Sequence, residues 1–62
     1  MTVKEIAIHN LFFALETWAK HYNKTVEDHP YFEKYQDIKN YPKYHKIADI
    51  KSLTRGILGA CI

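Results

Sequence analysis

The segment Val3–Tyr22, VKEIAIHNLFFALETWAKHY, is the one long stretch of the chain with a clear helical period. At about 100° per residue, six large apolar side chains fall within roughly one third of the helix circumference. They are Ile8, Leu11, Phe12, Leu15, Trp18 and Tyr22. Thr2 followed by Glu5 fits a capping box, in which each side chain accepts a hydrogen bond from the other residue's backbone N–H. We therefore expect a helix over about residues 3–22. Trp18 is expected to be central to its buried stripe, so that Trp18→Ala should cost about 3–5 kcal/mol.

Ile6 and Phe13, seven residues apart, lie off this stripe, on the polar side of the expected helix. Two interpretations are open. In so small a domain the favoured one is that a neighbouring helix reaches far enough round to cover both side chains. The alternative is an exposed apolar patch that binds a partner.

A short second helix is expected over about residues 30–39. Pro30 suits the first turn of a helix, and Asp28 just before it is a good capping residue. One face of this helix would carry Tyr31, Phe32, Tyr35 and Ile38. We expect Asn40, in the left-handed conformation, and Tyr41-Pro42 to end it, because proline disfavours a helical residue before it. The segment Thr25–Asp28 offers another cap, which predicts one helical turn upstream.

A third helix is expected from about residue 43 into the C-terminal region. One face carries Ile47, Ile50, Thr54, Ile57, Leu58 and Cys61, and the opposite face is a smooth ridge of Ala48, Ser52, Gly56, Gly59 and Ala60. Glycine inside a helix costs about 1 kcal/mol relative to alanine, so the ridge suggests close approach of another helix. The other reading ends the helix at Gly56. Continuation is favoured, which makes the chain an all-α, three-helix domain over residues 1–62.

Composition limits the class of protein. Sixty-two residues form one domain at most, and 47% hydrophobic residues are enough for a core. A single Cys cannot form an internal disulfide, which favours a reducing compartment. Glu5 stands where a signal peptide would be basic, and the apolar runs are too short to span a bilayer. We expect a cytoplasmic protein with no membrane association.

No catalytic, cofactor-binding or metal-binding set is legible. The four His residues, His9, His21, His29 and His45, show no i, i+3 or i, i+4 pairing, and there is no CxxC. Cys61 follows the expected C-terminal helix, where the dipole disfavours a thiolate, and is expected to pack as a small hydrophobe. We therefore expect no enzyme, no cofactor, no metal and no small-molecule substrate.

The segment 31–46 interleaves aromatic and basic residues. Rings beside ammonium groups can stack bases and neutralise phosphates, which makes nucleic acid a possible partner. The residues that would bind it are Lys34, Lys39, Tyr41, Lys43, Tyr44 and Lys46. The same rings can also roof the core or serve a protein interface, and the formal net charge of +2 is mild for a nucleic-acid binder.

The sequence favours a small non-enzymatic regulatory or adaptor protein, comparable in size to the inhibitors that phages and mobile elements encode. It would act by binding a protein partner or by self-association as a homo-oligomer. The predicted interface consists of Ile6, Phe13, Ser52, Gly56, Ala60 and Ile62. Nucleic-acid binding through segment 31–46 is the second hypothesis.

Overall fold

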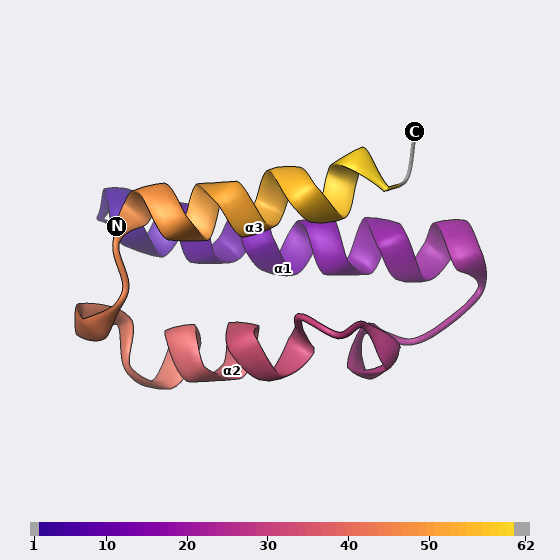
Figure 1. The fold of residues 1–62 in the computed structure, drawn as a ribbon, viewed down its shortest axis with the longest axis horizontal. Helices are drawn as coiled ribbons and strands as arrows, with labels where there is room; N and C mark the ends of the chain where they lie inside the picture. The colour runs from indigo at the N-terminus through magenta and orange to yellow at the C-terminus, as the bar shows by residue number, and fades with distance from the viewer. Residues whose placement is uncertain (1, 61–62) are drawn as a thin grey trace.

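The structure, a computed structural model, describes residues 2–60. Three helices make up most of this part of the chain: α1 (Val3–Tyr22), α2 (Phe32–Asn40) and α3 (Ile47–Gly59). Two short 3-10 turns join them, η1 (Val26–Asp28) and η2 (Pro42–Tyr44). α1 and α3 run side by side in the same direction, and α2 runs back against them (Figure 1). Within the described residues there is no strand, so the predicted all-α, three-helix fold is confirmed.

Local sequence signals set both ends of α1. The Thr2 hydroxyl accepts a hydrogen bond from the Glu5 backbone N–H (3.1 Å), and the Glu5 carboxylate accepts one from the Thr2 backbone N–H (3.4 Å). This is the predicted capping box. At the other end, Asn23 takes the left-handed conformation (φ 55°, ψ 48°), which Asn tolerates better than most residues. The predicted range of 3–22 is confirmed.

α2 begins at Phe32, two residues later than predicted. The expected cap, Asp28, is used elsewhere, because its carboxylate accepts a hydrogen bond from the Thr25 backbone N–H (3.1 Å) and so closes η1. The predicted turn at Thr25–Asp28 is thereby confirmed, while Pro30 and Tyr31 form a turn that leads into α2.

The predicted end of α2 is wrong in one detail. Asn40 is the last helical residue and is not left-handed, because Asn23 is the one non-glycine residue with a positive φ among those described. The helix stops at Tyr41 (φ −132°, ψ 60°), whose backbone N–H donates to the Asp37 carbonyl (2.9 Å). Pro42 disfavours the helical conformation at Tyr41, so no left-handed residue is needed to end α2.

α3 begins at Ile47 instead of about residue 43. Pro42 starts only the short turn η2, and His45 then takes an extended conformation (φ −124°, ψ 134°) that separates η2 from α3. The His45 Nε2 atom lies 2.7 Å from the Asp37 carboxylate, which ties this break to α2. The helix runs through Gly56 to Gly59, as predicted.

One hydrophobic cluster holds the three helices together. Its fully buried large side chains are Leu11, Leu15, Ile38, Ile50 and Ile57. Trp18 is only half-buried and packs on the edge of this cluster, so its predicted central position is wrong. Leu11 and Leu15 hold that position because both α2 and α3 converge on them.

The rim around Trp18 is aromatic. Its indole meets the His29 ring edge to face (centroids 4.6 Å apart) and lies beside the Tyr22 ring (5.6 Å). Burial lowers the pKa of His29. In addition, the Tyr31 backbone N–H donates to His29 Nδ1 (2.9 Å), which requires this nitrogen to be unprotonated. The rim is therefore built around neutral His29.

Leu11→Ala should lower the free energy of unfolding by about 2–5 kcal/mol, because it leaves a cavity among fully buried side chains. Phe13→Ala should change it by less than about 1 kcal/mol, because the Phe13 side chain is largely exposed. Urea denaturation of both variants measures the difference. Equal losses of stability would contradict the packing described above.

His29 should make the domain less stable in mild acid. Its folded pKa lies below the ordinary value of 6.5, so near and below that pH the unfolded chain binds more protons. Stability is therefore fully present above pH 6.5 and is lost as the pH falls toward the folded pKa. Urea denaturation between pH 7.5 and 5.5 should show a smaller loss in His29→Gln than in the wild type. His21→Gln, at an exposed position, is the control, and identical pH slopes for wild type and His29→Gln would contradict this role.

Candidate protein-binding surface

Ile6 and Phe13 are exposed to solvent, with 46% and 68% of their surface accessible. The favoured prediction, that a neighbouring helix covers them, is wrong. α2 and α3 both pack on the stripe that contains Leu11 and Leu15, and α3 borders the Ile6 side of α1 without covering it. The alternative of an exposed apolar patch fits the observed burial.

A line of exposed residues runs along this side of α1. Val3, Ile6, Asn10 and Phe13 follow one another at spacings of three, four and three residues, which places them on one face of a helix. All four are exposed, Val3 at 64%. We call these four residues the α1 seam. The spacing is that of a coiled-coil contact line, in which a single Asn is a common polar member.

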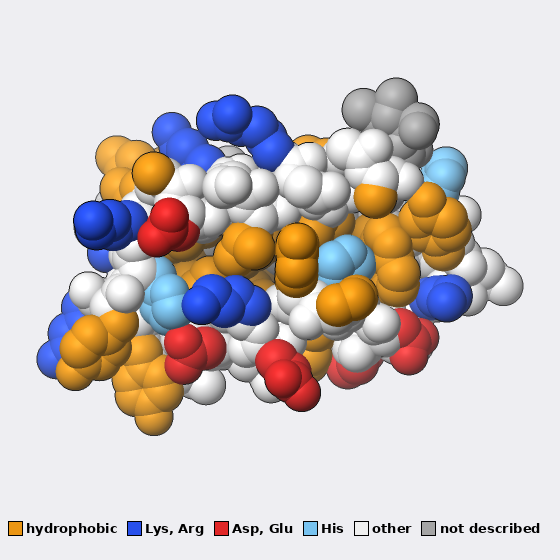
Figure 2. Space-filling model, viewed as in Figure 1, with side chains coloured by type: hydrophobic (Ala, Val, Ile, Leu, Met, Phe, Trp, Pro, Cys, Tyr) orange, Lys and Arg blue, Asp and Glu red, His pale blue; other side chains and the backbone are white. Residues whose placement is uncertain are grey.

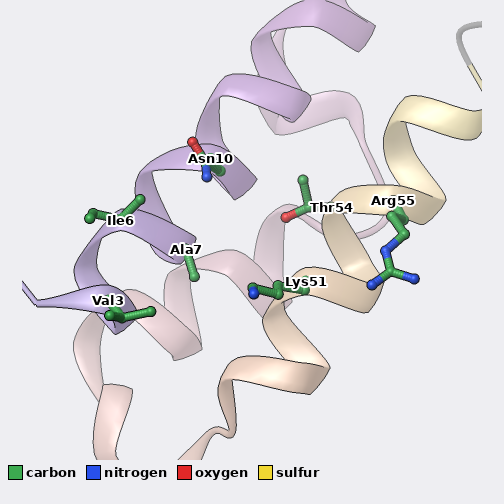
Figure 3. A pocket seen from close by; sticks show the side chains of 7 residues that line it. All are labelled: Val3, Ile6, Ala7, Asn10, Lys51, Thr54 and Arg55. Carbon is green, nitrogen blue, oxygen red and sulfur yellow. The ribbon is translucent and has the colours of Figure 1, made fainter.

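A hollow of about 330 Å³ lies between the N-terminal half of α1 and the middle of α3. Its lining consists of Val3, Ile6, Ala7 and Asn10 from α1 and Lys51, Thr54 and Arg55 from α3 (Figure 3). We call it the α1–α3 groove. The Lys51 side chain extends from α3 toward α1 (Figure 3). The Thr54 hydroxyl donates to the Ile50 carbonyl (3.0 Å). The charged residues of the lining are Lys51 and Arg55.

The small residues of α3 lie on a different surface from the α1 seam. Ser52 borders a hollow formed with Lys34 and Ile38 of α2. A Cβ added at Gly56 would lie 3.9 Å from the Tyr31 ring, which is ordinary contact, and one at Gly59 would meet nothing within 4 Å. The described residues thus show no close helix approach at the ridge. The predicted interface residues therefore lie on two surfaces: Ile6 and Phe13 belong to the α1 seam, whereas Ser52 and Gly56 belong to the small-residue side of α3.

The last members of the predicted interface lie at the end of the chain. Ala60 is exposed, and its carbonyl accepts a hydrogen bond from the Tyr22 hydroxyl (2.6 Å), which ties the end of α3 to the end of α1. Ile62 and Cys61 lie outside the described residues.

The predicted nucleic-acid residues form one cluster, with Lys39 beside it and Lys34 apart from it. Tyr41 and Tyr44 are exposed at 55% and 72%, with ring centroids 6.4 Å apart, and Lys43 Nζ lies 5.3 Å from the Tyr44 centroid. We call Tyr41, Lys43, Tyr44 and the neighbouring exposed Lys46 the η2 patch.

Three further basic residues differ in their position relative to the η2 patch. Lys39 borders a hollow that also includes Pro42, beside the η2 patch, whereas Lys34 faces the hollow between α2 and α3. Lys4 donates to the Pro42 carbonyl (3.0 Å), so α1 adds a cation next to the η2 patch. Sequence spacing could not show this contact, because it joins residues 38 positions apart.

Sequence reasoning also missed half of the α1 seam and both cations of the α1–α3 groove. Val3 and Asn10 could have been found, because the spacing of three, four and three residues is present in the sequence. Lys51 and Arg55 could not, because their position beside the seam depends on which faces of α1 and α3 pack together.

No protein-family model matches the chain, and comparisons with curated proteins and with solved structures likewise found no match. None of the helices within residues 2–60 has both the length and the apolar character that a bilayer span requires. In the same residues no three potential metal-ligating side chains converge.

Proposed function

We propose that this chain is a small non-enzymatic protein that acts by binding a protein partner through the α1 seam. The observation that carries the proposal is the exposure of Phe13, at 68%, in line with Val3 and Ile6 on one helical face. Single exposed apolar residues are common on protein surfaces, but an aligned group of them is typical of an interaction site. Occupation of a partner's surface by this face would suit an inhibitor or an adaptor.

The energetics of the α1 seam agree with a binding role. Val3 and Phe13 are largely left in water by the fold and Ile6 is nearly half exposed, so their contribution to folding is limited. Removing a large apolar side chain from water is worth about 1.5–3 kcal/mol, so Phe13 and Ile6 could supply a substantial part of an affinity. Aromatic residues such as Phe13 are also enriched in interfaces.

The proposal is tested by placing a photo-reactive phenylalanine analogue at position 13 and irradiating the protein in extract of the source organism. We expect a discrete protein adduct, because Phe13 would be buried at the interface. The same analogue at Gln36, an exposed position on α2, is the matched control and should give no such adduct. Absence of an adduct at position 13, or the same adducts at both positions, would overturn the proposal.

Nucleic-acid binding through the η2 patch is the second candidate function. The observation that favours it is the pair of exposed rings, Tyr41 and Tyr44, with Lys43 beside them. Exposed aromatic faces next to ammonium groups suit single-stranded nucleic acid. The Asp37 carboxylate lies on α2 close to this segment, 2.7 Å from His45 Nε2, and it weakens the local positive field. We therefore rank this candidate second.

The second candidate predicts that a fluorescein-labelled oligothymidylate binds at 25 mM NaCl and is released as the salt concentration rises. Tyr44→Ala should lose about 1–3 kcal/mol of binding free energy through lost stacking. Fluorescence anisotropy at 25 and 150 mM NaCl measures both effects. Failure to bind at micromolar protein and 25 mM NaCl would exclude this function for the η2 patch.

A further inference from the structure

We propose that the partner of the α1 seam is an acidic amphipathic helix that lies in the α1–α3 groove. This inference rests on the proposed function and adds to it the chemistry of the occupant. It draws on two independent features of the groove, its shape and its charge.

The shape of the α1–α3 groove suits a helix. α1 and α3 lie side by side, and none of the residues that line the groove comes from α2. A fourth helix placed there would complete a four-helix bundle, in which neighbouring helices pack through residues spaced three and four apart. Val3, Ile6, Asn10 and Phe13 have this spacing, and a facing helix could bury them together.

The basic residues of the groove determine the charge expected of that helix. Lys51 and Arg55 are exposed one turn apart on α3, and no Asp or Glu is among the described residues that line the groove. In Figure 2, Lys and Arg side chains stand along the upper edge, over α3, and others are spread over this face, whereas most acidic side chains in that view follow the lower edge, over α2 and η1. An approaching carboxylate would therefore meet Lys51 and Arg55 without a competing acid in the lining. Arg in particular binds carboxylates through two parallel hydrogen bonds.

Charge complementarity also argues against a second copy of this chain as the occupant. α1 carries two acids, Glu5 and Glu16, and two lysines, Lys4 and Lys20. The α1 of a second copy would thus offer Lys51 and Arg55 no net negative charge. A helix that carries carboxylates on both sides of an apolar stripe would supply the negative charge that complements Lys51 and Arg55.

The experiment uses two synthetic helical peptides of about 21 residues, long enough to hold a helix. Both carry Leu and Ile along one stripe; one has Glu on both flanks of the stripe and the other has Lys. Titration of the full chain, followed by fluorescence anisotropy at 50 mM NaCl, should show about tenfold tighter binding of the Glu peptide. The difference should shrink at 500 mM NaCl because salt screens the charges.

Charge reversal gives the decisive comparison. The double variant Lys51→Glu/Arg55→Glu should prefer the Lys peptide over the Glu peptide, and Phe13→Ala should weaken binding of the Glu peptide. Lys24→Glu, at an exposed position just after α1, is the control and should keep the preference for the Glu peptide. Thermal melts followed by circular dichroism verify that each variant is folded.

Four results would overturn the inference. Equal affinity for both peptides would remove the role of charge, and no Phe13-dependent binding of either would remove the helical occupant. Tighter Phe13-dependent binding to phosphatidylserine vesicles than to the Glu peptide would assign the surface to a membrane. Dimerisation in sedimentation that Phe13→Ala abolishes would assign it to a second copy. The cross-linking at position 13 tests separately whether any protein partner exists.

Discussion

The packing of α2 and α3 onto a single stripe of α1 determines the rest of this structure. Leu11 and Leu15 are fully buried beneath Ile38 of α2 and Ile50 and Ile57 of α3. A domain of this size has few large apolar side chains, and concentrating them on one stripe forms one continuous core. The consequence is that both helices lie on the same side of α1, and its outer side stays in water.

That constraint links folding to the proposed activity. Ala7 and Ala14 are buried in the core, and Ala7 also lines the groove that α1 forms with α3. The next residues round the helix are those of the α1 seam, which the core has no room to cover. Since Lys51 and Arg55 border the same groove, the chain presents an apolar line and a basic edge side by side. Such a surface is suited to selecting a partner by charge and holding it by apolar burial.

The sequence predicted those features that depend on neighbours along the chain. The Thr2–Glu5 box, the turn at Thr25–Asp28 and the continuation through Gly56 follow from local hydrogen bonding and periodicity, and the structure confirms them. The delayed start of α2 was missed because Asp28 could serve either of two caps. The exposure of Phe13 was the less favoured of two interpretations, because a helical wheel does not show how far neighbouring helices extend. The position of Lys51 beside Ile6 depends on a contact between distant segments, which no local pattern reveals.

Phe13 faces water in the free protein, while its neighbour Phe12 packs on the core. The most direct test of this difference is ¹⁹F NMR of protein labelled with 4-fluorophenylalanine, with the three resonances assigned by single Phe→Leu substitutions. Exchange of H₂O for D₂O should shift the Phe13 resonance markedly and the Phe12 and Phe32 resonances much less, because those two rings are half-buried. A solvent shift at Phe13 as small as that at Phe12 would show that the seam is covered, and would contradict the account.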